Sequence, residues 1–144
     1  MIYDAEKRNV TMAITGESLI SRQMKVFTEK QFLALKDVIT SADVSFTNAE
    51  MLFHNYEDAP STVPGGTYMR CDPQYIEDLK WMGFDIVATA NNHAWDFGEN
   101  GVLTNIQNLD KYGLPYAGTG VNLASASAPT YLDTNAGRVA LISA

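Results

Sequence analysis

Residues 84–98 have the sequence Phe-Asp-Ile-Val-Ala-Thr-Ala-Asn-Asn-His-Ala-Trp-Asp-Phe-Gly. The first five form a short apolar run, which is typical of a buried strand. Directly after it come an amide, an imidazole and a carboxylate, those of Asn92, His93 and Asp96. Such groups are costly to bury together unless a metal, a substrate or a hydrogen-bond network satisfies them. This stretch therefore predicts a strand that leads into a functional loop.

Strand and helix patterns alternate on both sides of this stretch. Apolar periodicity predicts strands at 10–15, 43–47, 84–89, 115–117 and 138–143. Helical spacing begins after a capping box at Thr28–Gln31, after an N-cap at Asp72, and after Gly98, with a weaker candidate at 124–128. Residues 55–71 are rich in proline and glycine and are expected to be a loop. The alternation predicts βαβ units and a mostly parallel sheet, which is the α/β class.

The composition limits the classes of partner. The chain has 144 residues, enough for one domain, and a net charge of −7. Since no basic patch is present to meet phosphates, nucleic acid and anionic membrane surfaces are not expected as partners. No apolar run approaches the roughly 20 residues of a transmembrane helix. The compartment stays open: cytoplasmic if Met1 is the natural start, and extracytoplasmic or membrane-associated if a signal segment was removed.

Polar residues follow three successive predicted strands. Ligands of parallel sheets bind beyond the carboxyl ends of the strands, so these residues are expected to share one edge. Carboxylate, amide and imidazole groups suit a hard or borderline divalent cation, which would also offset the repulsion between two carboxylates. The residues expected at this edge are Glu17, Asn48, Glu50, Asn91, Asn92, His93 and Asp96.

Each of these residues also has a plain structural interpretation. Glu17 and Glu50 fit solvated positions at turns, Asn91 and Asn92 fit turn residues, and His93 fits a hydrogen-bonded structural histidine. For Asp96, we favour an N-cap of the following helix over direct metal ligation. Only their joint placement favours a site.

Six further residues have structural interpretations of the same kind. His54 is expected to be a solvated loop residue, and Cys71 a structural one. Tyr68 and Arg70 fit either anion binding or an ordinary surface position. Trp95 and Phe97 are expected to pack against the edge of the sheet.

Several motifs, taken in order, resemble the CapA family of capsule and poly-γ-glutamate synthesis proteins. The resemblance spans residues 9–144, and its most specific piece is the Asn-Asn-His pattern with Asp96 and Gly98 behind it. The matching pieces are Gly16-Glu17, Ala42-Asp43-Val44, Asn48-Ala49-Glu50, residues 79–85, residues 90–98, Gly101, Leu109, Gly113 and residues 118–122.

The resemblance implies a metallophosphatase-like sandwich of two sheets with flanking helices and a dinuclear metal site. By position, Glu17, Glu50 and Asn92 would be metal ligands, and His93 would act on the substrate as an acid or electrostatic stabiliser. Asn48, Asn91 and Asp96 would support them. Two divalent ions are expected, with Mn, Fe, Zn and Mg all open. The implied chemistry is hydrolysis of a phosphoester, in which the metals activate water.

Two departures from the family pattern affect this assignment of site residues by position. The family has aspartate where this chain has Glu17. The extra methylene of glutamate moves the carboxylate by more than about 1 Å, whereas metal–ligand distances tolerate changes of only a few tenths of an ångström. The family's later histidine motifs are absent. Residues 1–144 are therefore expected to be the N-terminal βαβαβ part of one domain, inactive by itself, whose last strand at 138–144 pairs with another chain or is poorly ordered.

Two functions stay open from the sequence. One is a CapA-like metal-dependent hydrolase that acts on a small-molecule or polymer substrate and serves capsule or poly-γ-glutamate synthesis. The other is a non-catalytic accessory protein in capsule-polymer assembly or export, with a metal site that has drifted, as Glu17 would suggest.

Overall fold

A central sheet of four parallel strands organises the molecule. The computed structural model of the chain describes residues 9–63 and 66–144. The sheet contains β1 (Met12–Ser18), β2 (Val44–Ala49), β5 (Ile86–Ala88) and β6 (Tyr116–Ala117), in the spatial order β1-β2-β5-β6. All three neighbouring pairs are parallel. The α/β class and the parallel sheet predicted from the sequence are confirmed.

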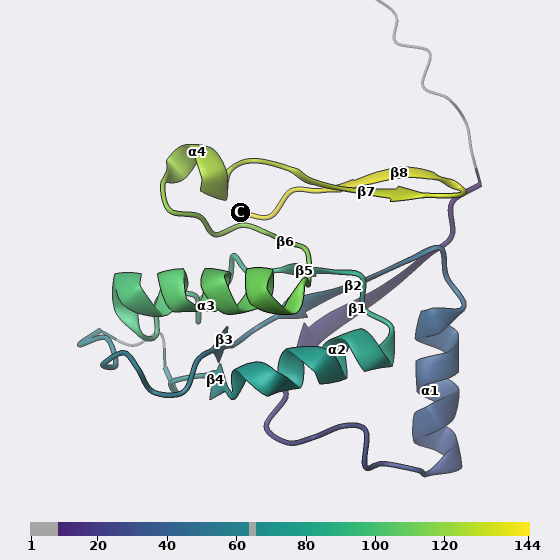
Figure 1. Cartoon of the computed structure of the whole chain (residues 1–144), viewed down its shortest axis with the longest axis horizontal. Coiled ribbons are helices and arrows are strands. Elements are labelled where there is room, and N and C mark those ends of the chain that lie inside the picture. Colours follow the sequence, from purple (N-terminus) through teal and green to yellow (C-terminus); the bar gives the residue numbers. More distant parts are fainter. Residues whose placement is uncertain (1–8, 64–65) are drawn as a thin grey trace, which may run out of the picture.

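Helices connect these strands. The helical elements are α1 (Lys30–Thr40), the 3₁₀ turn η1 (Pro73–Tyr75), α2 (Ile76–Met82), α3 (Gly98–Tyr112) and the short α4 (Leu123–Ala126). Helices α1, α2 and α3 lie on one side of the sheet (Figure 1). Between helices and sheet lies a core that includes Ile39, Leu79, Val87 and Leu109. No helix in the described part of the chain is long and apolar enough to cross a membrane.

The ends of α2 and α3 follow the predicted glycines. Gly83 and Gly113 have φ values of 101° and 64°, the left-handed conformation that favours glycine at a helix C-terminus. Gly83 is constrained by space as well, since a Cβ there would lie 2.4 Å from Cγ2 of Thr40. The α2–β5 connection therefore needs glycine for two independent reasons.

The start of α1, the end of β1 and the buried face of β1 differ from the sequence-based predictions. The N-cap of α1 is Glu29, without a side-chain hydrogen bond, so the predicted capping box at Thr28 is wrong. Strand β1 extends to Ser18, so Glu17 lies within the strand and not in a turn. The apolar residues Met12 and Ile14 are 44% and 68% exposed. The alternation identified the strand but not the buried face, because β1 is an edge strand and the helices cover its other side.

The predicted loop 55–71 contains part of a second, small sheet. Strands β3 (Leu52–Phe53) and β4 (Arg70–Cys71) pair in parallel. Strands of two residues carry no periodicity, so the sequence pattern could not reveal them. Cys71 is buried, and this burial raises the pKa of its thiol to about 12.

The C-terminal strand has a partner within the chain. Strand β7 (Thr130–Thr134), which the sequence analysis missed, pairs antiparallel with β8 (Gly137–Leu141). Asp133 and Arg138 form a bidentate ion pair across this hairpin, with N···O distances of 2.6 and 2.8 Å. The hairpin lies on the side of the sheet opposite α1–α3 (Figure 1). The expectation that the last strand lacks a partner in this chain is therefore wrong, whereas self-association through residues 138–144 stays a prediction.

His54 is buried, against the prediction of a solvated loop residue. Its side chain is 0% exposed, and its Nδ1 accepts the backbone N–H of Tyr56 at 3.1 Å. Burial lowers the pKa of His54, and the positive charge of Arg70 lowers it further, while Glu57 and Asp58 oppose the shift. The folded chain thus holds this imidazole neutral.

This burial predicts a pH dependence of stability. Because the pKa of His54 is lower in the folded than in the unfolded chain, the unfolded state takes up the proton first as the pH falls. The contribution of His54 to the free energy of unfolding is therefore complete above about pH 6.5 and declines as the pH falls below that value. Urea unfolding between pH 5 and 8 should show a shallower decline for His54→Asn, which keeps an acceptor for Tyr56. Equal declines in the two proteins would contradict the prediction.

Candidate functional site

The carboxyl ends of β1, β2 and β5 lie side by side. Glu17 in β1 is opposite Asn48 in β2, and Asn48 is opposite Ala88 in β5. Glu50 follows the end of β2, and the loop 91–96 follows β5. The sheet order thus brings the polar strand ends to one edge, and a bulge in β1 between Ile14 and Glu17 sets the position of Glu17.

Two carboxylates meet at this edge. Glu50 is 9% exposed, and its Oε2 has no hydrogen-bond partner among the described residues. Burial raises the pKa of Glu50, and the neighbouring carboxyl group of Glu17 raises it further, while His93 opposes the shift. Two carboxylates so placed favour a proton or a cation between them.

The loop after β5 separates its side chains into a buried and an exposed row. Its backbone bonds run from residue i+3 to residue i, with Asp96 N–H donating to His93 O at 3.1 Å and Gly98 N–H to Trp95 O at 3.0 Å. In such 3₁₀-like turns, side chains three residues apart share a face. His93 and Asp96 accordingly form the buried row, and Asn92 and Trp95 the exposed one. Trp95 is 57% exposed and Phe97 only 3%, so the packing expected of both holds for Phe97 alone.

His93 is held in one orientation by Asp96. The Nδ1 atom lies 2.8 Å from Oδ2 of Asp96, which is 1% exposed. A carboxylate only accepts hydrogen bonds, so Nδ1 is the donor, and Nε2 faces Oε1 of Glu50 at 3.9 Å. The N-cap of α3 is Phe97, with no side-chain hydrogen bond. The predicted N-cap role of Asp96 is therefore wrong, because its carboxylate is turned toward His93 instead.

Asn91 connects two strand ends. Its Nδ2 donates to Oδ1 of Asn48 at 3.2 Å and to the carbonyl of Ala49 at 3.0 Å, and its Oδ1 accepts the N–H of His93 at 3.1 Å. These bonds hold the loop after β5 against the end of β2. Asn92, by contrast, is exposed and forms no side-chain hydrogen bond within residues 9–63 and 66–144.

The groups available to a cation are few. Within residues 9–63 and 66–144, no cluster of three or more His, Cys, Asp or Glu side chains is arranged to hold a metal ion. The Glu17–Glu50 pair supplies two carboxylates, Oε2 of Glu50 is buried without a partner, and Asn48 lies opposite Glu17 at the same strand ends. Asn92, on the exposed row of the loop, is not brought together with them. This donor set fits part of the coordination of a divalent ion.

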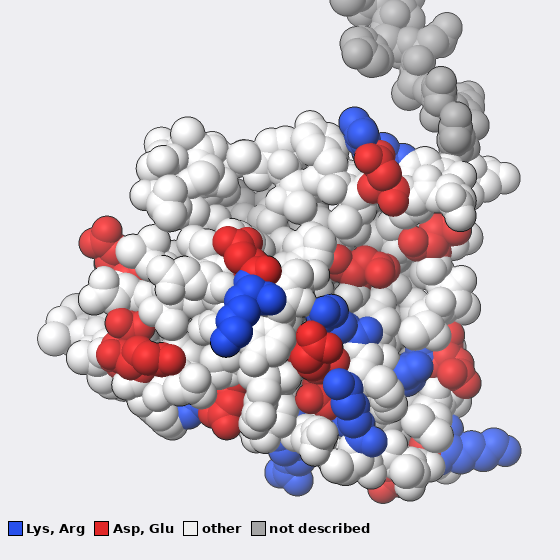
Figure 2. All heavy atoms as spheres, in the orientation of Figure 1, with Lys and Arg blue, Asp and Glu red and all other residues white. Residues whose placement is uncertain are grey.

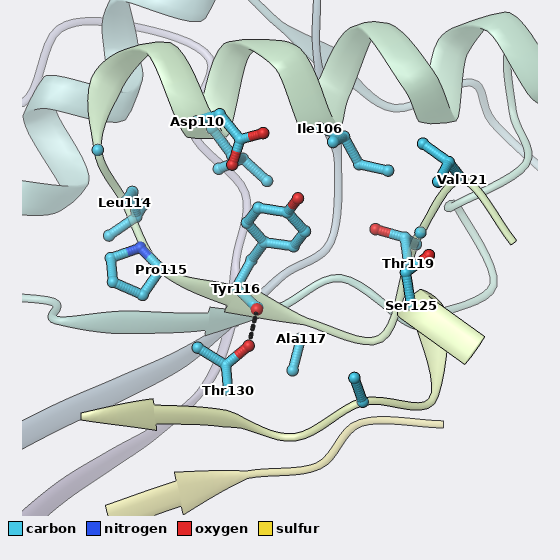
Figure 3. Close-up of a pocket in the computed structure, with 14 residues that line it drawn as sticks. Ile106, Asp110, Leu114, Pro115, Tyr116, Ala117, Thr119, Val121, Ser125 and Thr130 are labelled. Atoms are coloured by element: carbon cyan, nitrogen blue, oxygen red, sulfur yellow. Dashed lines mark hydrogen bonds between the residues drawn. The ribbon is translucent and has the colours of Figure 1, made fainter. Parts of the chain in front are cut away.

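A hollow in the surface lies away from this edge of the sheet. It measures about 560 Å³ and is lined by α3, β6 and the segment that follows β6. Tyr116 points across it toward α3, with Asp110 nearby (Figure 3). Burial raises the pKa of Tyr116, and Asp110 raises it further. None of the candidate site residues lines this hollow, so the chemistry of the strand ends locates the candidate site, not the size of a cavity.

The charges on the face shown in Figure 2 are mixed. Lys and Arg side chains lie among Asp and Glu side chains there, and the upper part of this face carries few charges. The visible described residues therefore present no basic patch on this face.

Several known proteins are similar to this chain. The sequence profile of the bacterial capsule synthesis protein family PGA_cap matches residues 8–144. The uncharacterized protein y4sH of Sinorhizobium fredii is 37% identical over 136 residues, which are 92% of this chain and 30% of that protein.

Two proteins from Bacillus are more distant. The capsule biosynthesis protein CapA of Bacillus anthracis is 24% identical over 95% of this chain and 35% of its own length. The PGA biosynthesis protein CapA of Bacillus subtilis is 23% identical over 81% of this chain and 32% of its own length. The chain thus spans about a third of the length of the curated relatives it matches.

Proposed function

We propose that the chain, which belongs to the bacterial capsule synthesis protein family PGA_cap, carries part of the active site of a metal-dependent phosphoester hydrolase. In this proposal the enzyme serves the synthesis of a capsule polymer, of which poly-γ-glutamate is one candidate. One observation supports the hydrolase most: Glu50, which neighbours Glu17, faces an imidazole whose far nitrogen is bound by Asp96.

His93 has the orientation required of a proton donor. Asp96 occupies Nδ1, so Nε2, on the side of Glu50, is the ring nitrogen left to exchange a proton with a substrate. From there Nε2–H can protonate a leaving oxygen or stabilise negative charge on the attacked group. Divalent cations held by Glu17 and Glu50, with the amide of Asn92, would supply an activated water and offset the charge of the phosphate.

The accessory function remains the second candidate. It is favoured by Glu17 in the place of the family's aspartate and by the small number of cation ligands that the described residues bring together. In that case the strand ends would keep the family's geometry and bind no metal tightly. The chain would then act by contact with the capsule polymer or with the proteins that assemble or export it.

Metal binding separates these two functions. We expect the protein to bind Mn²⁺ in a calorimetric titration and Glu50→Gln to bind it at least about tenfold more weakly, since one carboxylate ligand is lost. Glu29→Gln is the matched control, because it removes the same charge from an exposed residue at the start of α1. Absence of Mn²⁺, Zn²⁺ and Fe²⁺ binding by the unmodified protein would contradict the hydrolase and leave the accessory function.

A further inference from the structure

Asp96 is bound by a segment far from it in sequence. The backbone N–H of Ser61 donates to the carbonyl of Asp96 at 2.8 Å. The backbone N–H of Met69 donates to its Oδ2 at 2.6 Å. Both ends of the segment 61–69, of which the structure describes all but residues 64–65, are therefore attached to the residue that orients His93.

Tyr68 ties the two ends of this segment to each other. Its hydroxyl donates to the carbonyl of Ser61 at 2.6 Å, and its ring lies 5.8 Å from that of Phe97, the neighbour of Asp96. The bond joins the residue before Met69 to Ser61. Ser61, Tyr68 and Met69 thus form a closed arrangement around Asp96.

One oxygen of Asp96 couples this arrangement to His93. Oδ2 accepts both the N–H of Met69 and the Nδ1–H of His93. Loss of the Met69 bond would remove one of the two bonds that hold this carboxylate, and with it part of the restraint on the His93 ring.

We infer that Tyr68 is a positioning residue for His93, acting through Ser61, Met69 and Asp96. The inference rests on the proposed function for its catalytic meaning, but the coupling itself is a property of the folded chain. Neither interpretation considered from the sequence, anion binding or an ordinary surface position, included this role for Tyr68.

Hydrogen exchange by NMR tests the coupling without metal or substrate. In Tyr68→Phe the ring stays and only the hydroxyl is lost, so the segment should open about three- to tenfold more often. The N–H protons of Ser61 and Met69 and the Nδ1–H proton of His93 should then exchange with water faster by the same factor. Tyr56→Phe is the matched control, because the Tyr56 hydroxyl makes no hydrogen bond within the described residues and its ring stacks on Arg70 at 3.9 Å in either form.

Each outcome decides the question. Joint acceleration of the three protons in Tyr68→Phe, with none in Tyr56→Phe, supports the inference. Acceleration at Ser61 and Met69 without His93 overturns it, and so does unchanged exchange at all three. Finding the proton of neutral His93 on Nε2 instead of Nδ1 also overturns it. Because no activity is measured, failure of the proposed hydrolase leaves these results unaffected.

Discussion

Replacement of His93 by glutamine should lower metal-dependent phosphoester hydrolysis by about 10²- to 10⁴-fold, the usual contribution of a positioned acid or base. Glutamine retains a polar group of similar reach but cannot release a proton at neutral pH. The loss should appear in kcat, since His93 is proposed to act on the reacting group and not on binding of the whole substrate. The suitable assay is Mn²⁺-dependent release of phosphate or of a chromogenic leaving group.

The structure explains why this loss should be large. His93 is buried, its Nδ1 is fixed by Asp96 at 2.8 Å, and its backbone N–H is held by Asn91 at 3.1 Å. A flexible glutamine cannot reproduce the position of a ring that is fixed in this way. We therefore expect His93→Gln to fold and to bind Mn²⁺ with little change, while its kcat falls strongly.

The other histidine supplies the control. His54→Asn changes a buried imidazole that interacts with the Tyr56 N–H and the ring of Phe97, and it is expected to retain activity at pH 7.5 and low temperature. The assay requires the longest natural form of the protein that contains this chain, because the curated relatives are about three times longer. Equal activity of the unmodified protein and His93→Gln would refute the catalytic role.

The arrangement of the main sheet could be predicted because its signals are local. Each central strand has an apolar run, helices α1, α2 and α3 each have a periodic apolar face, and Gly83 and Gly113 mark helix ends by the conformations they adopt. Parallel order follows once strands alternate with helices. The meeting of Glu17, Glu50 and His93 at one edge is a direct consequence of that order.

The remaining features depend on contacts between distant residues. Asp96 has the local sequence of an N-cap, yet the N–H of Met69, 27 residues away, and the ring of His93 determine its orientation. His54 begins a polar loop in sequence, yet it is buried against Phe97 with ring centroids 4.1 Å apart. Strands β3 and β4 have two residues each and exist only because they pair with each other.

We expect Asn105→Ala to lower the free energy of unfolding by about 2–3 kcal/mol, the usual effect of leaving a buried hydrogen-bonding group unsatisfied. Asn105 is 1% exposed in the interior of α3, and its Oδ1 accepts the backbone N–H of Phe53 at 2.8 Å. Phe53 is itself fully buried. Its neighbour Leu52 donates its N–H to the carbonyl of Met69, and His54 donates its N–H to the carbonyl of Cys71 in β4. Asn105→Ala removes the acceptor of the Phe53 N–H, which lies in a fully buried residue.

Asn108→Ala is the matched comparison for this prediction. Asn108 donates to the carbonyl of the same residue, Phe53, at 2.8 Å, but it is only half-buried. Water can replace it, so a loss of about 1 kcal/mol is expected. Urea unfolding of both variants gives the difference. Because β3 begins two residues after Glu50, a large effect of Asn105 would mean that α3 holds this strand, and with it the carboxylate of the candidate site. Equal effects of the two variants would instead mean that β2 alone determines the position of Glu50.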